Sequence, residues 1–212
     1  MSVENIYYLP KLVDLRFAPK CGLTNSKTLW QKLGGRVDYT YIKGGPSNHR
    51  EKQWWDKGDI HDPPFRKNSI RFAIKRDPVK RFLSCVDFLN RSHHAHVKNT
   101  SIRPYPAKGF SSLEEAITAI EKGNVMNWHF LTQTYFYGDK NKYNYVYDLT
   151  DMDQAISHML EIINPPWSEN KKNQIINLRE NKSIKGLSLE VTHDIIERIK
   201  ILYRIDYENG WC

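Results

Sequence analysis

The sequence predicts an α/β fold with a mainly parallel central sheet flanked by helices, in one domain that spans residues 1–212. Two stretches, residues 12–33 and residues 69–86, indicate this fold. In each, an apolar or alternating run of strand length leads directly into a segment with helical periodicity. The length of 212 residues and the 40% hydrophobic content suit one such domain with a substantial core, and are too small for two.

The first stretch places a tight loop between a strand and a helix. Residues 12–17 are the expected strand, and residues 26–33 are the expected helix, which Gly34-Gly35 ends. The first turn of a helix offers unpaired backbone N–H groups and the positive end of the helix dipole, so this loop suits a phosphate group. An ordinary strand-to-helix connection with a basic rim is the alternative. The candidate contacts are Lys20, Cys21, Gly22, Leu23, Thr24, Asn25 and Ser26.

The second stretch repeats this arrangement. Its first half alternates as a strand, after which Asp77 is the expected N-cap and Pro78 the first helical residue. Arg76 stands where the strand ends, which is the edge at which open α/β sheets collect ligands. Ser84 is expected on the flank of the helix, away from its apolar stripe.

Together the two stretches resemble the donor-binding motifs of sulfotransferases that use PAPS (3′-phosphoadenosine 5′-phosphosulfate). Their 5′-phosphosulfate loop is similar to Pro19-Lys20-x-Gly22-x-Thr24-Asn25-Ser26-Lys27, and their 3′-phosphate motif to Arg76-Asp77-Pro78-x-x-Arg81-Phe82-x-Ser84. The resemblance is closest to the membrane-bound carbohydrate sulfotransferases, although Ser26 stands where that group has Trp. It implies a P-loop-like domain in which residues 20–26 bind the 5′-phosphosulfate, and Arg76 and Ser84 bind the 3′-phosphate.

Two further segments extend the resemblance toward the C-terminus. Residues 127–133 partly match the Asp-x-His-Trp-x-x-Gln segment of carbohydrate sulfotransferases, which makes His129 a candidate catalytic residue; a buried structural histidine is the alternative. The ending Leu202-Tyr203-x-x-Asp206-Tyr207-Glu208 resembles the Tyr-x-x-Asp-Tyr ending of the family. A helix that Ser188 can cap is expected before this ending. Just ahead of that helix, we also assign to the donor site Lys182, Lys185 and Gly186.

The resemblance implies transfer of a sulfuryl group from PAPS to an acceptor hydroxyl, with PAP as the desulfated product. The expected acceptor is a carbohydrate, while an acidic acceptor, a protein tyrosine or a small metabolite stays open. Lys20 is placed to stabilise charge on the bridging oxygen, and a histidine serves as the base. We favour His61, which lies between the two donor motifs where related heparan 2-O-sulfotransferases carry a catalytic histidine, over His129. No metal is required, because the leaving group is a phosphate of low pKa.

Composition narrows the classes of partner. The 32 Lys and Arg residues against 24 Asp and Glu residues give a formal net charge of +8, which favours an anionic partner. The three cysteines are an odd number without metal-site spacing, which favours a reducing compartment. No apolar run reaches membrane-spanning length, and residues 1–10 lack a signal-peptide core. We therefore expect a soluble cytoplasmic protein with no membrane or nucleic-acid partner; its oligomeric state stays open.

Two rival functions remain. A P-loop nucleotide kinase or hydrolase would need a loop closed by Lys and Ser/Thr, which this sequence lacks. A non-enzymatic polyanion-binding module would account for the positive net charge, but it would need no organised strand, loop and helix. The remaining expected elements are a strand over 37–42, a polar and basic loop over 90–112 with His93, His94 and His96 as part of a lid, a helix over 112–122, a strand over 143–147 and a helix over 152–163.

Overall fold

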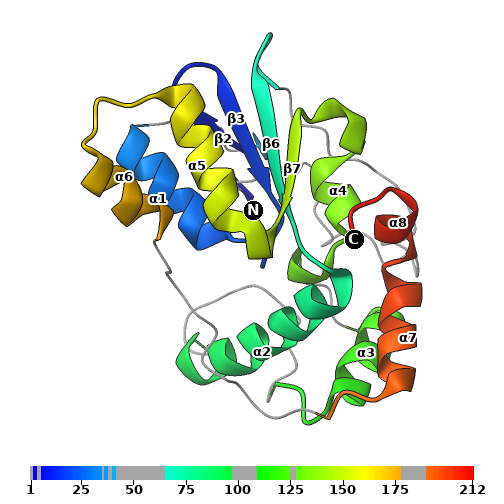
Figure 1. The fold of residues 1–212 in the computed structure, drawn as a ribbon. Helices are drawn as coiled ribbons and strands as arrows, with labels where there is room; N and C mark the ends of the chain where they lie inside the picture. The colour runs from blue at the N-terminus through cyan, green and yellow to red at the C-terminus, as the bar shows by residue number, and fades with distance from the viewer. Residues whose placement is uncertain are drawn as a thin grey trace.

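The computed structural model describes residues 2–3, 6–34, 36–37, 40–41, 65–96, 109–124, 128–177 and 190–212. Its centre is a five-stranded sheet with the strand order β4-β2-β3-β6-β7 (Figure 1). The strands β3 (Val13–Phe17), β6 (Ile70–Lys75) and β7 (Tyr145–Asp148) run parallel to one another, which confirms the parallel part of the predicted α/β fold. The other side of the sheet is antiparallel, because β2 (Ile6–Leu9) pairs antiparallel with both β3 and β4 (Arg36–Val37).

The two faces of the sheet carry different helices. Alternate residues of β3 and β6, such as Leu15 and Phe72, share one apolar cluster with the helices α1 (Leu23–Leu33), α5 (Met152–Ile163) and α6 (Glu169–Ile176). On the other face, Ala73 of β6 packs in a cluster with α4 (Gln133–Tyr137) and with Trp211. The strands thus separate two hydrophobic cores, as their period of two requires.

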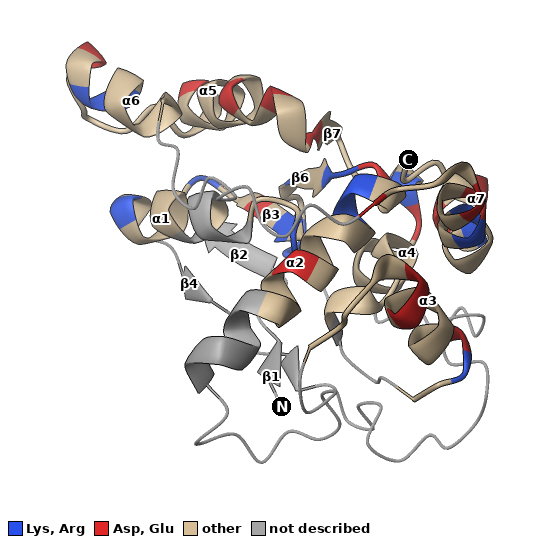
Figure 2. Cartoon of the chain, turned by 90° about the horizontal axis from the view of Figure 1, so that it is seen from below, with Lys and Arg blue, Asp and Glu red and all other residues tan. Residues whose placement is uncertain are grey.

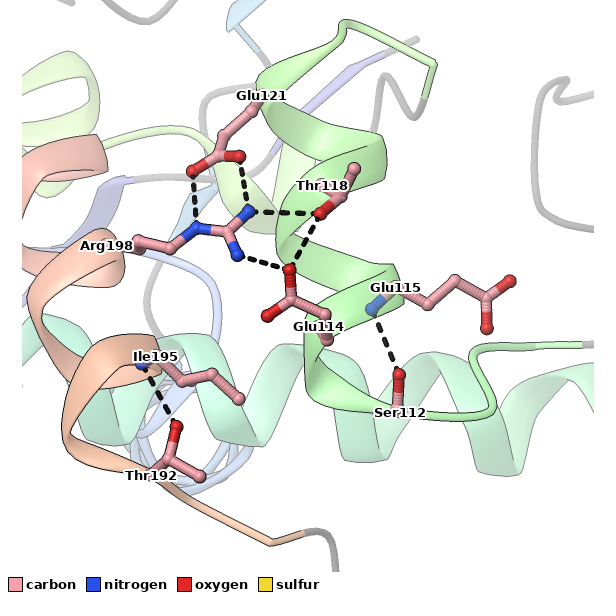
Figure 3. Close-up of polar contacts among 8 residues, drawn as sticks. All are labelled: Ser112, Glu114, Glu115, Thr118, Glu121, Thr192, Ile195 and Arg198. Atoms are coloured by element: carbon pink, nitrogen blue, oxygen red, sulfur yellow. Dashed lines mark hydrogen bonds and ion pairs between the residues drawn. The ribbon is translucent and has the colours of Figure 1, made fainter.

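A third cluster lies beyond the end of the strands. It joins α2 (Pro78–His96) and α3 (Leu113–Glu121) with α7 (His193–Leu202), and Figure 1 shows these helices below the sheet, where β6 leads into α2. The short helix α8 (Arg204–Glu208) follows α7. Arg198 of α7 holds α3 through Glu121 Oε2, at 2.6 Å from its Nη2, through Thr118 Oγ1 at 3.0 Å, and through an ion pair with Glu114 (Figure 3).

Most helix boundaries follow local sequence signals. The Asp77 carboxylate accepts a hydrogen bond from Lys80 N at 2.8 Å, which confirms Asp77 as the cap of α2. Ser112 caps α3 through Glu115 N, and the left-handed Gly34 ends α1. The helix expected over 152–163 has the same bounds as α5. By contrast α1 begins at Leu23 rather than at Ser26, so the residues of the predicted phosphate loop after Gly22 form its first turn.

Three expectations were wrong. The single strand expected over 37–42 is two short strands, because β4 joins the main sheet while β5 (Thr40–Tyr41) pairs with β1 (Ser2–Val3). The loop expected from residue 90 begins later, because α2 continues to His96 through a segment without Gly or Pro. The three clustered histidines 93, 94 and 96 therefore lie on a helix. Thr192, not Ser188, caps α7 through Ile195 N at 3.3 Å; Ser188 lies outside the described residues.

Candidate active site

The two predicted donor motifs open onto the same edge of the sheet. Strands β3 and β6 are parallel neighbours with Phe17 beside Ile74, so the segments that follow them start side by side. The first continues through residues 18–22 into α1, and the second continues through Arg76 and Asp77 into α2. Figure 2 shows Lys and Arg coloured along the end of β6 and the first turn of α2. This edge therefore has the placement and the charge that an anionic ligand requires.

The loop between β3 and α1 has an unusual backbone. Lys20 has a φ of 67° and Gly22 a φ of 80°, both in the left-handed region. A Cβ atom on Gly22 would lie 2.9 Å from Leu149 Cδ1 and 3.1 Å from Met152 Cε, so the position needs glycine for its conformation and for its space. The left-handed Lys20 has a strained conformation of the kind that functional loops retain, at a cost of about 1–2 kcal/mol.

The N-terminus of α1 is suited to an anion. Among the described residues no side chain caps this helix, and its first turn contains no acidic residue. Residues 23–25 lie in the first turn, as the predicted contacts require, although their side chains are not among the described ones. Ser26 is fully buried, and its Oγ has no hydrogen-bond partner within the described part of the chain. An anion at these N–H groups would satisfy donors that the protein leaves open.

The two motifs contact each other directly. Nη1 of Arg76 donates a hydrogen bond to the Lys20 carbonyl oxygen at 3.1 Å. Arg81, which the sequence analysis left without a role, joins them a second time, because its Nε donates to the Pro19 carbonyl oxygen at 2.9 Å. Ser84 lies on the second turn of α2 and is buried. The structure thus links the predicted 3′-phosphate motif to the predicted 5′-phosphosulfate loop through two arginines.

Arg81 also holds the segment that carries His129. Its Nη2 and the Sγ of Cys85 both donate to the His129 carbonyl oxygen, at 3.0 Å each. Arg81 is fully buried, and its Nη1 finds no hydrogen-bond partner among the residues that the structure describes. Burial raises the pKa of the Cys85 thiol, and it raises that of Cys21 to about 11 despite the nearby arginines. Both thiols therefore stay protonated around the arginine.

Lys20 and His129 lie around one aromatic ring. The ammonium nitrogen of Lys20 is 4.6 Å from the centroid of the Phe88 ring, and the His129 ring centroid is 4.8 Å from it. Burial, followed by the positive charges of Lys20 and Arg81, lowers the pKa of His129 to about 3. The imidazole is therefore neutral across the physiological range but a weak base. The other candidates, His61, Lys182, Lys185 and Gly186, lie outside the described residues.

Gln133 is a site residue that the sequence reasoning missed. It is fully buried at the start of α4, and its Oε1 accepts a hydrogen bond from Arg76 N at 2.8 Å and from Cys21 Sγ at 3.4 Å. Its signal was present in the sequence, because it is the final residue of the segment that resembles Asp-x-His-Trp-x-x-Gln.

The acidic residues at this edge have structural roles. Asp77 caps α2, and Asp148, at the end of β7, accepts a hydrogen bond from Thr150 N at 2.9 Å. In the described ranges no three His, Cys, Asp or Glu residues gather in a way that could hold a metal ion. Over the same ranges, no helix is both long and apolar enough to cross a membrane.

Comparison with known proteins gives one finding. No curated protein and no solved structure matches the chain. A family model described as the sulfotransferase family matches residues 16–209. The match begins in β3 and ends just after α8, so it includes the loop before α1, the segment from Arg76 to Ser84, and Gln133. Since most of the chain is covered, this protein belongs to the sulfotransferase family and is an enzyme that transfers sulfuryl groups.

Proposed function

We propose that this sulfotransferase uses PAPS as its donor and a carbohydrate hydroxyl as its acceptor, with PAP as the second product. The contact between Arg76 Nη1 and the Lys20 carbonyl oxygen, at 3.1 Å, carries the proposal. It brings a loop suited to a phosphosulfate within one hydrogen bond of an arginine suited to a second phosphate. A nucleotide that is phosphorylated at both the 5′ and the 3′ positions would use both groups.

The residues present fit such a donor. The α1 N-terminus has no acidic residue in its first turn, Gly22 has no room for a side chain, and a Ser26 hydroxyl is buried without a partner among the described residues. Residues 20–26 would hold the 5′-phosphosulfate, because their N–H groups and the Lys20 charge complement it. Arg76 and Ser84 would hold the 3′-phosphate. Lys182, Lys185 and Gly186 are proposed as further contacts from the sequence alone.

The bound donor would supply a sulfuryl group attached to a phosphate leaving group. The acceptor oxygen forms a new S–O bond while the S–O bond to the phosphate breaks, and the acceptor proton passes to a histidine. Lys20 would stabilise the negative charge that develops on the bridging oxygen, for which its place at the start of the loop is suited. Arg76 and Arg81 would keep the loop in position, because both donate to its carbonyl oxygens.

His61 remains the preferred base. A general base is most effective when its pKa is near the working pH. The pKa of His129 is far below the working pH, since it is lowered to about 3. His129 would instead contact the acceptor or shape the site beside Lys20, through the Phe88 ring that both residues contact. The carbohydrate acceptor rests on the resemblance of the loop to the carbohydrate sulfotransferases.

A thermal-shift panel tests the donor. A ligand that binds the native state raises the midpoint of unfolding, by the equivalent of about 2.7 kcal/mol at a hundred times its Kd. We expect PAP to raise the midpoint more than ATP, GTP or AMP at equal concentration. A larger shift with ATP or GTP would favour a nucleotide kinase or hydrolase, and equal shifts with all four would favour a general polyanion-binding module. Turnover of PAPS with a panel of oligosaccharides then tests the acceptor.

A further inference from the structure

The side-chain amide of Gln133 is fully used inside the protein. Its Oε1 accepts hydrogen bonds from Arg76 N at 2.8 Å and Cys21 Sγ at 3.4 Å. Its Nε2 donates to the carbonyl oxygens of Arg76 at 2.7 Å and Trp211 at 2.8 Å. Both neighbours of Oε1 are hydrogen-bond donors, and both neighbours of Nε2 are acceptors. Only one orientation of the amide therefore satisfies all four hydrogen bonds.

Gln133 thereby clamps the backbone at the point where β6 ends. It bonds both the N–H and the C=O of Arg76, in the way a neighbouring strand would, although no strand in the described part of the chain pairs with Arg76. The peptide groups on either side of Arg76 are fixed, and with them the direction in which the arginine side chain leaves the sheet. The bond to Cys21 fixes the middle of the loop Lys20-Cys21-Gly22 by the same amide oxygen.

We propose that Gln133 is a positioning residue that sets the two donor-binding motifs relative to each other, an inference that rests on the proposed PAPS donor. Gln133 acts through Arg76 and Cys21 and does not itself contact the donor. Its loss would displace the Arg76 guanidinium from a 3′-phosphate, because that side chain would no longer leave from a fixed backbone. A charge-assisted hydrogen bond is the most sensitive to such a displacement, since its strength depends on distance and direction.

The C-terminal end of the chain supports this clamp. The two carboxylate oxygens of Asp206 accept hydrogen bonds from Gln133 N at 2.9 Å and Thr134 N at 2.7 Å, which fixes the start of α4. Trp211, which supplies the carbonyl oxygen for the amide, is fully buried and donates from Nε1 to the Gly138 carbonyl oxygen at 3.0 Å. Asp206 and Trp211 thus contact the donor site through Gln133.

The chain offers a matched control for the clamp. Asn90 of α2 holds Phe110 in the same manner, because its Oδ1 accepts from Phe110 N at 2.8 Å and its Nδ2 donates to the Phe110 carbonyl oxygen at 3.1 Å. Both amides are buried, and both bond the N–H and the C=O of one distant residue. Phe110 belongs to the apolar cluster of α2, α3 and α7, which includes Phe82 of the 3′-phosphate motif but none of the residues proposed to contact the donor. Asn90→Leu therefore removes a clamp of the same kind without disturbing the donor motifs.

The test compares the affinities for PAP and for AMP, which lacks the 3′-phosphate, in the parent, in Gln133→Met and in Asn90→Leu. Gln133→Met keeps the length of the side chain and removes its hydrogen bonds. Gln133→Asn serves as a second variant that keeps a buried amide but is too short to reach Arg76. We expect both Gln133 variants to lose about tenfold or more of the preference for PAP over AMP. We expect Asn90→Leu to keep the parental preference while its midpoint of unfolding falls.

Three outcomes are distinguishable. The inference is supported if the preference for PAP over AMP falls in the Gln133 variants toward that of Arg76→Ala. Combining a Gln133 change with Arg76→Ala should then lower the preference no further, because residues that act as one unit are not additive. Gln133 variants that are less stable but keep the parental preference for PAP overturn it, and they leave the proposed donor intact. A parent that binds PAP no better than AMP overturns the proposed donor, and the inference with it.

Discussion

Arg81 and Asp206 are buried together, and each charge favours the ionised form of the other. Burial raises the pKa of Asp206, while the N–H groups of Thr134 and Gln133 and the charge of Arg81 oppose that rise. Burial lowers the pKa of Arg81, but its neighbours, Asp206 among them, raise it overall above the ordinary value. The thiols of Cys85 and Cys21 and the hydroxyl of Tyr203 stay protonated beside Arg81, so among these neighbours Asp206 is the one that can offset the buried cation.

Asp206→Asn should therefore cost the protein much of its stability. Removal of one partner leaves a buried cation without compensation, a change that typically costs about 3–5 kcal/mol. The amide also replaces one acceptor oxygen with a donor, which faces the N–H of Gln133 or Thr134. Denaturant unfolding at neutral pH measures the loss. Glu208→Gln, on the exposed side of α8, is the matched control and should change the free energy of unfolding by less than about 1 kcal/mol.

A double-mutant cycle tests the coupling itself. If Arg81 and Asp206 compensate each other, Arg81→Met combined with Asp206→Asn should cost less than the sum of the two single changes. Strict additivity of the two would contradict the pairing, because the variants would then be destabilised for unrelated reasons.

Lys20→Ala should lower the rate of sulfuryl transfer far more than it weakens PAP binding. A group that stabilises charge in the transition state is typically worth about 2.7–4 kcal/mol there, or about 10² to 10³ in rate. Lys20 lies at the loop where the charge on the bridging oxygen would develop, and its ammonium group reaches over Phe88. Single-turnover rates and PAP titrations of the same preparation separate the two effects.

The control for this variant is Lys32→Ala, which removes an exposed lysine from the last turn of α1, at the opposite end of that helix from the loop. It should leave both the rate and the affinity close to those of the parent. Equal losses of rate and affinity in Lys20→Ala would contradict a role confined to the transition state.

Arg76→Ala and Ser84→Ala should weaken the binding of PAP and spare the binding of AMP. The loss should be larger for Arg76, since a guanidinium carries a positive charge and can donate two parallel hydrogen bonds to a phosphate, whereas Ser84 donates one from a neutral hydroxyl. Arg204→Ala, which removes an exposed arginine of α8 paired only with Glu208 in the described structure, controls for the loss of positive charge. Isothermal titration measures the affinities. Parental PAP affinity in both variants would show that the 3′-phosphate binds elsewhere.

Local chemistry explains which parts of the fold were predictable. The signals that succeeded are short: Asp77-Pro78 at the start of α2, Ser112 before α3, and Gly34 after α1 each act on the turn beside them. The strands β3 and β6 were predicted because both alternate, or run apolar, over a full strand length. The antiparallel β2 was missed, and β4 and β5 were merged into one expected strand, because pairing between short strands depends on distant partners that no local pattern specifies.

The candidate site also has a part that local sequence signals predict and a part that they do not. The loop Lys20-Cys21-Gly22 and Arg76 could be found, because each stands at the junction of a strand and a helix. The roles of Arg81 and Gln133 could not be found, since their partners are separated from them by 48 to 112 residues along the chain. Burial of Arg81 could not be predicted from the helix sequence, because a buried arginine requires several carbonyl partners that only the tertiary fold supplies.

The pH dependence of the rate should identify the base. A histidine that abstracts the acceptor proton must be neutral, so the rate follows the neutral fraction and rises with pH through the pKa of that residue. His129 has its pKa lowered to about 3, so it is neutral throughout the range from pH 5 to pH 8 and would give a rate independent of pH there. A histidine with an unperturbed pKa of about 6.5 would give a tenfold fall in rate for each unit below about pH 6.

We expect the second profile, together with loss of turnover in His61→Ala at unchanged PAP affinity. His193→Ala removes an exposed histidine of α7 and should retain both the rate and its pH profile. A flat profile from pH 5 to pH 8, with turnover lost only in His129→Ala, would transfer the role to His129, and the base would then be a weak one placed beside Lys20. Parental turnover in both single variants would mean that the proton goes to another group, and the proposed position of the acceptor would be wrong with it.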